Sequence, residues 1–347
     1  MEIAAAFLKF AVCSAIIIIA GTKLSKYGDV ISEKTGLSGV WIGVVMMATA
    51  TSLPELITGS SAIALVGAPD LALGDAFGSN LFNLLVIAML DLVSRGRPIL
   101  SQVRLAHIVS ASLGILLIGT AVASIFLSTI FALPALGWVG IYSPLLVLLY
   151  IVGIRLVYTF EKRGVQRFLD KEAAVMRYED LSLRLAVVGY LIAAAFIIGA
   201  GTWLAFVGEE IAHLTSLGTT FIGTLLLATT TSLPEAVVSM TALRLGARDM
   251  AVANMLGSNL FNMGIVLAVD DVVSINGPLM ALVDVQHVFT GLIAIVMSAV
   301  VIVGVIFRSE RTDRVALRWE TVTLITIFLL GMYTLYLMQA FRPELRG

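Results

Sequence analysis

The sequence predicts an all-α membrane protein of ten transmembrane helices, arranged as two inverted five-helix repeats in which helices 2 and 7 are broken. Three observations predict this fold: the composition, the spacing of the apolar runs and an internal repeat. Of the 347 residues, 59% are hydrophobic and 13% are charged, whereas a soluble domain carries about 45–50% apolar and about 25% charged residues. The net charge of −1 and the lack of a block of Lys and Arg argue against nucleic acid as a partner.

Ten apolar runs are long enough to cross a bilayer, which takes about 20 residues in a helix. The first run is interpreted as part of the fold rather than as a secretory signal, because it lacks a small-residue cleavage site and has a counterpart in the second half. The ten runs cover residues 4–22, 39–66, 71–93, 106–127, 133–158, 184–206, 219–245, 250–274, 285–307 and 321–341. The lipid bilayer is therefore the main predicted partner.

The basic residues predict the orientation of these helices. All of the 22 Lys and Arg residues except Lys9, Arg342 and Arg346 fall in the loops that follow helices 1, 3, 5, 7 and 9. The positive-inside rule places those loops in the cytoplasm and both termini on the extracytoplasmic side of a plasma or inner membrane. The polar stretch 161–183 is predicted to be a cytoplasmic linker between a first repeat, 1–160, and a second repeat, 184–347.

The two halves share two sequence motifs in the same order. Residues 48–55 read ATATSLPE and residues 228–235 read ATTTSLPE, which is a separation of 180 residues. After a slip of one residue, the motif GSNLFN at 78–83 recurs at 257–262. Each half holds an odd number of helices, so the halves enter the membrane in opposite orientations. This is the architecture of inverted-repeat transporters, whose substrate site lies near the middle of the bilayer where broken helices meet.

Proline and glutamate stand at the centre of the first motif. Pro54 and Pro234 are expected to break their helices, because proline lacks a backbone donor and clashes with the carbonyl four residues earlier. The carbonyl groups freed in this way are tolerated only where they are buried in protein or line a cavity. Glu55 and Glu235 follow directly, and an acid within the membrane costs at least about 2.5 kcal/mol and indicates function. Two such carboxylates repel each other unless a cation lies between them.

The second motif adds side-chain oxygens of the kind that bind hard cations. Ser79 and Asn83 are one helical turn apart and face the same side, and Ser258 and Asn262 repeat that spacing. Oxygen ligands alone select ions such as Ca²⁺ or Na⁺. The three histidines, His107, His213 and His287, lie near predicted helix ends and are interpreted as unrepeated, which disfavours zinc or copper.

The sequences TSLPE and GSNxFN, each present twice in a ten-helix chain, closely resemble those of the sodium/calcium exchanger family of the cation/calcium antiporter superfamily. The resemblance implies a secondary transporter, not an enzyme, that exchanges Ca²⁺ for Na⁺ by alternating access, with three Na⁺ per Ca²⁺ and no cofactor. It implies a Ca²⁺ site of Glu55, Glu235, Thr51 and Thr231. It also implies two flanking Na⁺ sites that add Ala48 and Ser79 on one side and Ala228 and Ser258 on the other, with Asn83, Asn262, Ser52, Ser232 and Asp75 as further candidate ligands.

Departures from the family pattern leave some alternatives open. Ala50 and Thr230 replace the glycine of the family and are expected to crowd the helix breaks. Asp75 stands where the second half has Asn254, and it either adds a third acid to the site or faces the cytoplasmic vestibule. The resemblance makes helices 1 and 6, with glycines at 21, 28, 201 and 208, candidates for a sliding gate. The protein is expected to be a monomer.

Two other functions compete with sodium/calcium exchange. The nearer alternative is an H⁺/Ca²⁺ antiporter, because carboxylates can carry protons. The distant alternative is an intramembrane enzyme that uses Ser52 or Ser232 as nucleophile. Neither serine has a nearby histidine or lysine base in the sequence, and an enzyme site is normally built once rather than twice.

Overall fold

The structure is a computed structural model that describes residues 2–34, 49–94, 98–165, 181–244, 246–307 and 318–340. Within this part of the chain the protein is almost entirely helical. The first half contains α1 (Glu2–Lys34), α3 (Leu53–Ser61), the π-helix η1 (Ala62–Val66), α4 (Pro69–Val93), α5 (Ile99–Gln102), α6 (Ala106–Ser128), the strands β1 (Ala135–Leu136) and β2 (Val139–Gly140), and α7 (Tyr142–Val165).

The second half repeats this order with more interruptions. It contains α8 (Leu183–Thr215), α9 (Thr219–Ile222), the π-helix η2 (Gly223–Leu227), α10 (Ala228–Thr231), α11 (Leu233–Arg244), α12 (Arg248–Phe261), the π-helix η3 (Asn262–Val266), α13 (Leu267–Val273), α14 (Leu279–Leu282), α15 (Gln286–Phe307) and α16 (Trp319–Ala340).

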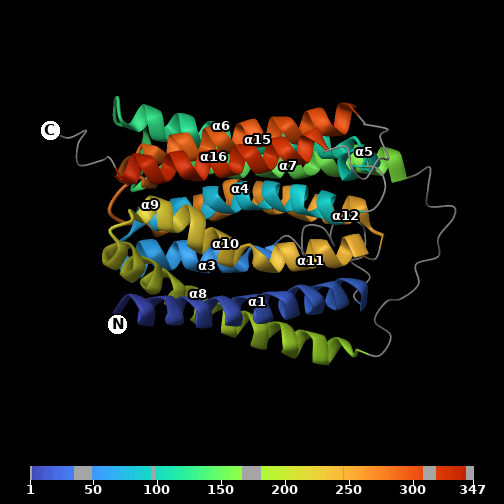
Figure 1. The fold of residues 1–347 in the computed structure, drawn as a ribbon, viewed down its shortest axis with the longest axis horizontal. Helices are drawn as coiled ribbons and strands as arrows, with labels where there is room; N and C mark the ends of the chain where they lie inside the picture. The colour runs from blue at the N-terminus through green and yellow to red at the C-terminus, as the bar shows by residue number, and fades with distance from the viewer. Residues whose placement is uncertain are drawn as a thin grey trace.

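The helices lie side by side in layers, with elements of both halves in each layer (Figure 1). α1 packs against α8 at one edge, and α6, α7, α15 and α16 form the opposite edge. Between them lie α3, α10 and α11, and then α4 and α12. In an apolar 18-residue window of each span, the share of buried residues is 72% for Pro69–Val93 and 78% for Arg248–Val273. The share is only 22% for the spans in α1 and in α8. α4 and α12–α13 therefore form the centre of the protein, and α1 and α8 present most of their apolar surface outward.

Among the described residues, seven helices are long and apolar enough to cross a membrane, and an eighth span counts if the bent pair of helices around Ser232 is one span. Helical segments within Leu53–Val66 and Tyr142–Val157 are apolar but shorter. An integral membrane protein is thereby confirmed. The count of ten spans and the inverted relation of the halves stay predictions.

Several predicted boundaries were wrong. α1 and α8 each have 33 residues and continue to Lys34 and Thr215, well beyond the predicted ends at 22 and 206. Their polar ends extend the helices past the apolar stretch that defined each prediction. The predicted span 133–158 starts with a two-stranded hairpin, so its helix begins only at Tyr142 and runs on to Val165.

Two of the three described π-helices, η1 and η3, account for the slip in the sequence repeat. The repeat spacing is 180 at Glu55 and Glu235 and 179 at Gly78 and Gly257. η1 lies between these motifs in the first half, where the second half has an uninterrupted α11. A π turn holds one more residue than an α turn, so η1 supplies the extra residue. The spacing returns to 180 by Pro98 and Pro278, after η3 adds one residue to the second half.

The breaks predicted at the prolines lie two residues earlier. The helical pattern is interrupted at Ser52 and Ser232, and each proline then occupies the first turn of the next helix. This position suits proline because the first turn does not need its missing N–H. In the second half, the axes of the two segments, Thr219–Thr231 and Leu233–Arg244, differ by 43°.

Candidate cation-binding site

The predicted ligands come together in the centre of the protein. α3 contributes Glu55, α11 contributes Glu235, and the flanking residues 51–52 and 231–232 stand at the helix breaks. α4 and the α12–η3 segment contribute the second motif from each half. The side chains of these residues are at most 1% exposed; they are Thr51, Ser52, Glu55, Asp75, Ser79, Asn83, Thr231, Ser232, Glu235, Ser258 and Asn262. Ala228 is equally buried, and Ala48 lies outside the described residues.

Crossed hydrogen bonds connect the two helix breaks. The Ser52 hydroxyl donates to Glu235 Oε1 at 3.0 Å. In the same way the Ser232 hydroxyl donates to Glu55 Oε1 at 2.9 Å. Each serine therefore positions the carboxylate of the opposite half, which holds both glutamates in one buried cluster.

Two pairs of hydroxyls extend this reciprocal pattern. Thr51 Oγ1 lies 3.5 Å from Ser258 Oγ, and Ser79 Oγ lies 3.4 Å from Thr231 Oγ1. Each pair joins a threonine next to a helix break with the serine of the GSN motif from the other half. In the structure each of these threonines therefore lies next to the serine of the other half, and not next to the serine of its own half.

Asp75 breaks the symmetry of the cluster. Its Oδ1 accepts a hydrogen bond from the Thr231 hydroxyl at 2.9 Å, and its side chain is 1% exposed. It therefore lies inside the cluster and not in an open vestibule. Its counterpart Asn254 instead donates to Ser239 Oγ at 3.0 Å and to the Glu235 carbonyl oxygen at 3.4 Å.

The amide side chains fill the other side of the cluster. Asn83 donates to Asn259 Oδ1 at 2.9 Å, and Asn259 donates to the Asn80 carbonyl oxygen at 3.3 Å. Asn259 was missed as a site residue, although its place in the repeated GSN motif was a usable signal. Neither amide atom of Asn262 has a hydrogen-bond partner.

Several buried oxygens of the cluster have no hydrogen-bond partner among the described residues. They include Oε2 of Glu55, Oε2 of Glu235 and Oδ2 of Asp75. Such atoms are rare, because leaving one buried and unpaired costs about 1–3 kcal/mol. In the described residues no Lys, Arg or His forms an ion pair with these three acids. Oxygens of this kind suit a hard cation that satisfies several of them at once.

No group of three or more His, Cys, Asp or Glu side chains arranged to hold a metal occurs in the described ranges. The candidate donors are the carboxylate, hydroxyl and amide oxygens of the buried residues named above.

The two replacements for the family glycine contact α1. Ala50 packs with Ala20 and Leu24 of α1. The Thr230 hydroxyl lies 3.1 Å from Ser14 Oγ, also on α1. The expected crowding of the helix breaks stays a prediction.

Glycines allow α1 to lie directly against a helix break. A Cβ at Gly21 would lie 2.5 Å from Pro234 Cγ and 2.8 Å from Pro234 Cβ. At the corresponding Gly201 the nearest atoms would be Thr58 Oγ1 at 3.1 Å and Ile57 Cγ2 at 3.2 Å. The two contacts differ because Gly21 meets the proline, while Gly201 meets residues about one turn beyond Pro54.

The interpretation of the histidines as unrepeated was wrong. His107 and His287 are 180 residues apart. His107 Nε2 lies 3.0 Å from Asp249 Oδ1, and His287 Nε2 lies 3.1 Å from Asp70 Oδ1. Each pair joins the two halves near helix starts, away from the cluster, so the histidines serve as interhelical contacts.

A protein-family model described as "Sodium/calcium exchanger protein" matches residues 5–159 and 185–337, which is most of the chain. The chain belongs to the sodium/calcium exchanger protein family. The resemblance identified from the repeated motifs is thereby confirmed. Members of this family are secondary transporters and not enzymes, so the exchanger is a membrane antiporter for Ca²⁺ and a second cation.

Individual relatives agree with this assignment. Inner membrane protein YrbG of Escherichia coli (strain K12) is 27% identical over 258 residues, which are 73% of this exchanger and 75% of YrbG. Sodium/calcium exchanger MaX1 of Methanosarcina acetivorans is 32% identical over 145 residues, which are 41% of this exchanger and 38% of MaX1. The solved H⁺/Ca²⁺ exchanger CAX covers 96% of this chain and 85% of its own, with a TM-score of 0.68 and 13% identity. At that identity the similarity shows the fold alone.

Proposed function

We propose that this protein exchanges Ca²⁺ for Na⁺ across a plasma or inner membrane by alternating access. The observation that carries the proposal is the buried pair of Glu55 and Glu235, one from each half, with crossed serine hydrogen bonds and one unpartnered oxygen on each carboxylate. The name of MaX1 and the description of the family support sodium as the coupling ion. The fold proposed around this pair has ten spans in two inverted repeats, 1–160 and 184–347, with both termini extracytoplasmic. We also propose that the monomer is the transport unit.

The ligands follow from the buried oxygens. Ca²⁺ is assigned to Glu55 and Glu235 with the hydroxyls of Thr51 and Thr231, because a divalent ion best balances two carboxylates. Na⁺ is assigned to the flanking positions at Ser79 and Ser258, with the carbonyl oxygen of Ala228 as a further neutral ligand; Ala48, its predicted counterpart, lies outside the described residues. Asn83 and Asn262 complete the central cluster, and Ser52 and Ser232 orient the carboxylates.

Charge balance couples the two ions. If the glutamates stay ionised, Ca²⁺ neutralises them, while three Na⁺ leave one net positive charge. One charge moved per cycle couples transport to the membrane potential by about 2.3 kcal/mol per 100 mV. Because the same carboxylates serve both ions, Ca²⁺ and Na⁺ compete, and the competition enforces exchange rather than leak.

Proton coupling is the second candidate, and the buried carboxyl of Asp75 favours it. The decisive experiment measures ⁴⁵Ca²⁺ uptake into proteoliposomes that contain the purified protein. An outward Na⁺ gradient at fixed pH is expected to drive uptake, and a pH gradient without Na⁺ is not. Uptake driven only by the pH gradient would refute sodium coupling and support the proton alternative.

Glutamine substitutions test the site itself. Glu55→Gln and Glu235→Gln are each expected to abolish Ca²⁺ uptake while the protein keeps its thermal unfolding temperature. Glu209→Gln is a matched control, because the Glu209 side chain is 34% exposed and lies in the outer helix α8. Retained exchange in either buried variant would overturn the site assignment.

A further inference from the structure

Asp270 is a buried acid that lies outside the cluster and has no role in the cycle described above. Its side chain is fully buried in α13, and its Oδ1 accepts a hydrogen bond from the Ser60 hydroxyl at 3.0 Å. Within the part of the chain that the structure describes, its Oδ2 has no hydrogen-bond partner. A buried carboxylate with one free oxygen and no cation beside it is costly, so its presence calls for a ligand or a structural reason.

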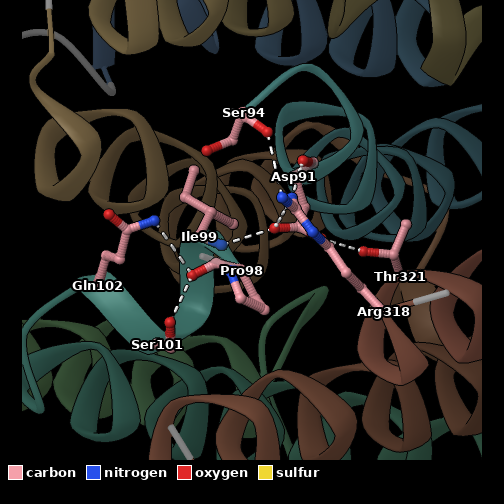
Figure 2. A network of polar contacts seen from close by, with 8 residues as sticks. All are labelled: Asp91, Ser94, Pro98, Ile99, Ser101, Gln102, Arg318 and Thr321. Atoms are coloured by element: carbon pink, nitrogen blue, oxygen red, sulfur yellow. Dashed lines mark hydrogen bonds and ion pairs between the residues drawn. The ribbon is translucent and has the colours of Figure 1, made fainter. Parts of the chain in front are cut away.

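Asp270 does not play the anchoring role that an acid plays at the end of α4 in the first half. Eight residues after Asn83 stands Asp91, and eight residues after Asn262 stands Asp270. Asp91 accepts from the backbone N–H of Ile99 at 2.6 Å and from Arg318 Nη1 at 2.8 Å, and so connects the end of α4 to the first residue of α5 (Figure 2). The corresponding anchor in the second half is another residue, Asp271.

Asp271 performs the anchoring task fully. It accepts from the backbone N–H of Leu279 at 2.7 Å, from the Tyr142 hydroxyl at 2.6 Å and from the backbone N–H of Gly140 at 2.8 Å. The extra residue of η3 has moved Asp271 into the position that Asp91 holds in the first half. Asp270 is therefore released from the anchor and turned toward α3.

The surroundings on α3 leave room for a carboxylate. A Cβ at Gly59 would lie only 2.8 Å from Asp270 Oδ2, so the glycine permits the close approach. Gly59 follows Glu55 by four residues, which is one turn or about 6 Å along the same helix. Asp270 thus continues the acidic cluster along α3.

Asp270 lies between the cluster and one end of the bundle. It stands eight residues beyond Asn262, about 12 Å along the helix axis, and three residues before the end of α13 at Val273. Ser60 lies in α3, which continues directly into η1 and ends at Val66. An ion that leaves Glu55 toward this end of the bundle would meet Asp270 next.

We propose that Asp270, with the Ser60 hydroxyl, is an additional cation-binding residue that passes Ca²⁺ or Na⁺ between the central cluster and the membrane face at which α13 ends. This inference rests on the proposed function. The positive-inside orientation makes that face extracytoplasmic. A single carboxylate and a hydroxyl leave the ion partly hydrated, which suits a position that must release its ion quickly.

The test uses Asp270→Asn, which keeps the shape of the side chain and can still accept from Ser60. Ca²⁺ dependence of exchange is measured from each side, in vesicles of both orientations. The KM for Ca²⁺ is expected to rise about fivefold or more at the α13 face, from loss of one charge at short range, and to stay unchanged at the other face. Equal KM changes at both faces, or an altered pH profile with unchanged KM, would overturn the proposal.

Two further variants separate this effect from misfolding. Gly59→Ala keeps Asp270 but places a methyl group against its Oδ2. The variant is expected to raise the KM for Ca²⁺ at the α13 face alone. Gly119→Ala is the matched control, because a Cβ there would meet nothing within 4 Å. A one-sided effect of Gly119→Ala equal to that of Gly59→Ala would contradict the inference.

A binding measurement keeps the inference distinct from the proposed function. Equilibrium dialysis with ⁴⁵Ca²⁺ on purified Glu55→Gln is expected to retain weak binding, and adding Asp270→Asn is expected to remove it. If wild-type protein shows no Na⁺-driven exchange, the proposed function fails. The ⁴⁵Ca²⁺ binding measurement still shows in that case whether Asp270 binds Ca²⁺. If the two variants bind Ca²⁺ equally, the Asp270 site is refuted even when exchange is intact.

Discussion

The contact between Gly21 and Pro234 gives the sharpest quantitative prediction. Gly21→Ala would place a methyl carbon 2.5 Å from a ring carbon of Pro234, far inside van der Waals contact. Overpacking of this kind costs about 1–3 kcal/mol, which is about a 5- to 150-fold change in an equilibrium constant. The conformation in which α1 lies against the helix break should lose population by that factor.

The assay is the maximal rate of Na⁺-driven Ca²⁺ uptake, together with the thermal unfolding temperature in detergent. Gly21→Ala is expected to lower the rate at least about fivefold, because the cycle must pass through a disfavoured conformation. Gly201→Ala should have a smaller effect, since its neighbours are side-chain ends at 3.1 and 3.2 Å that can shift. Gly199→Ala is the control. Gly199 lies in α8 together with Gly201, and a Cβ at Gly199 would meet nothing within 4 Å. If Gly21→Ala behaves like Gly199→Ala in both measurements, the contact does not take part in the cycle.

Three further predictions concern other polar contacts. Asp75→Asn gives position 75 the same residue as its counterpart Asn254 in the other half. The variant should keep Na⁺-driven exchange, and low pH should inhibit its Ca²⁺ uptake less strongly. Unchanged inhibition at low pH would show that protons do not compete through Asp75. Ser52→Ala and Ser232→Ala each delete a hydrogen bond to a carboxylate, and such a bond contributes about 1.5–3 kcal/mol. Both variants should therefore raise the KM for Ca²⁺ by similar factors. Clearly unequal factors would show that the two glutamates are not equivalent. Asp271→Asn should lower the free energy of unfolding by about 1–3 kcal/mol, as measured by thermal denaturation, and an unchanged unfolding temperature would contradict its role as an anchor.

The sequence was sufficient for the parts of the fold that depend on local composition. Every apolar run corresponds to at least one described helix, because a helix buried in lipid must be apolar along its length. The glutamates and the helix breaks were also predictable, since proline acts on its own backbone and an acid in an apolar run is conspicuous. The length of α1 was not predictable, because its last residues are polar and lie beyond the apolar stretch.

Contacts between distant segments could not be predicted in the same way. The crossed bonds from Ser52 and Ser232 depend on how the two breaks face each other, which no local pattern encodes. The repeat of His107 and His287 was visible in the numbering but was overlooked, because the changing register of the repeat disguises it. Asp270 was missed because its neighbour Asp271 looks equivalent in sequence, and only η3 distinguishes their directions.

The offset positions of η1 and η3 mean that neither half is a full copy of the other. A protein made by joining two copies of the first half would carry the extra residue of η1 twice and lack that of η3 altogether. Such a tandem duplicate would hold two anchoring acids of the Asp91 kind and none in the place of Asp270. The single-residue insertions therefore give the two faces of the exchanger different chemistry around a centre to which each half contributes one glutamate.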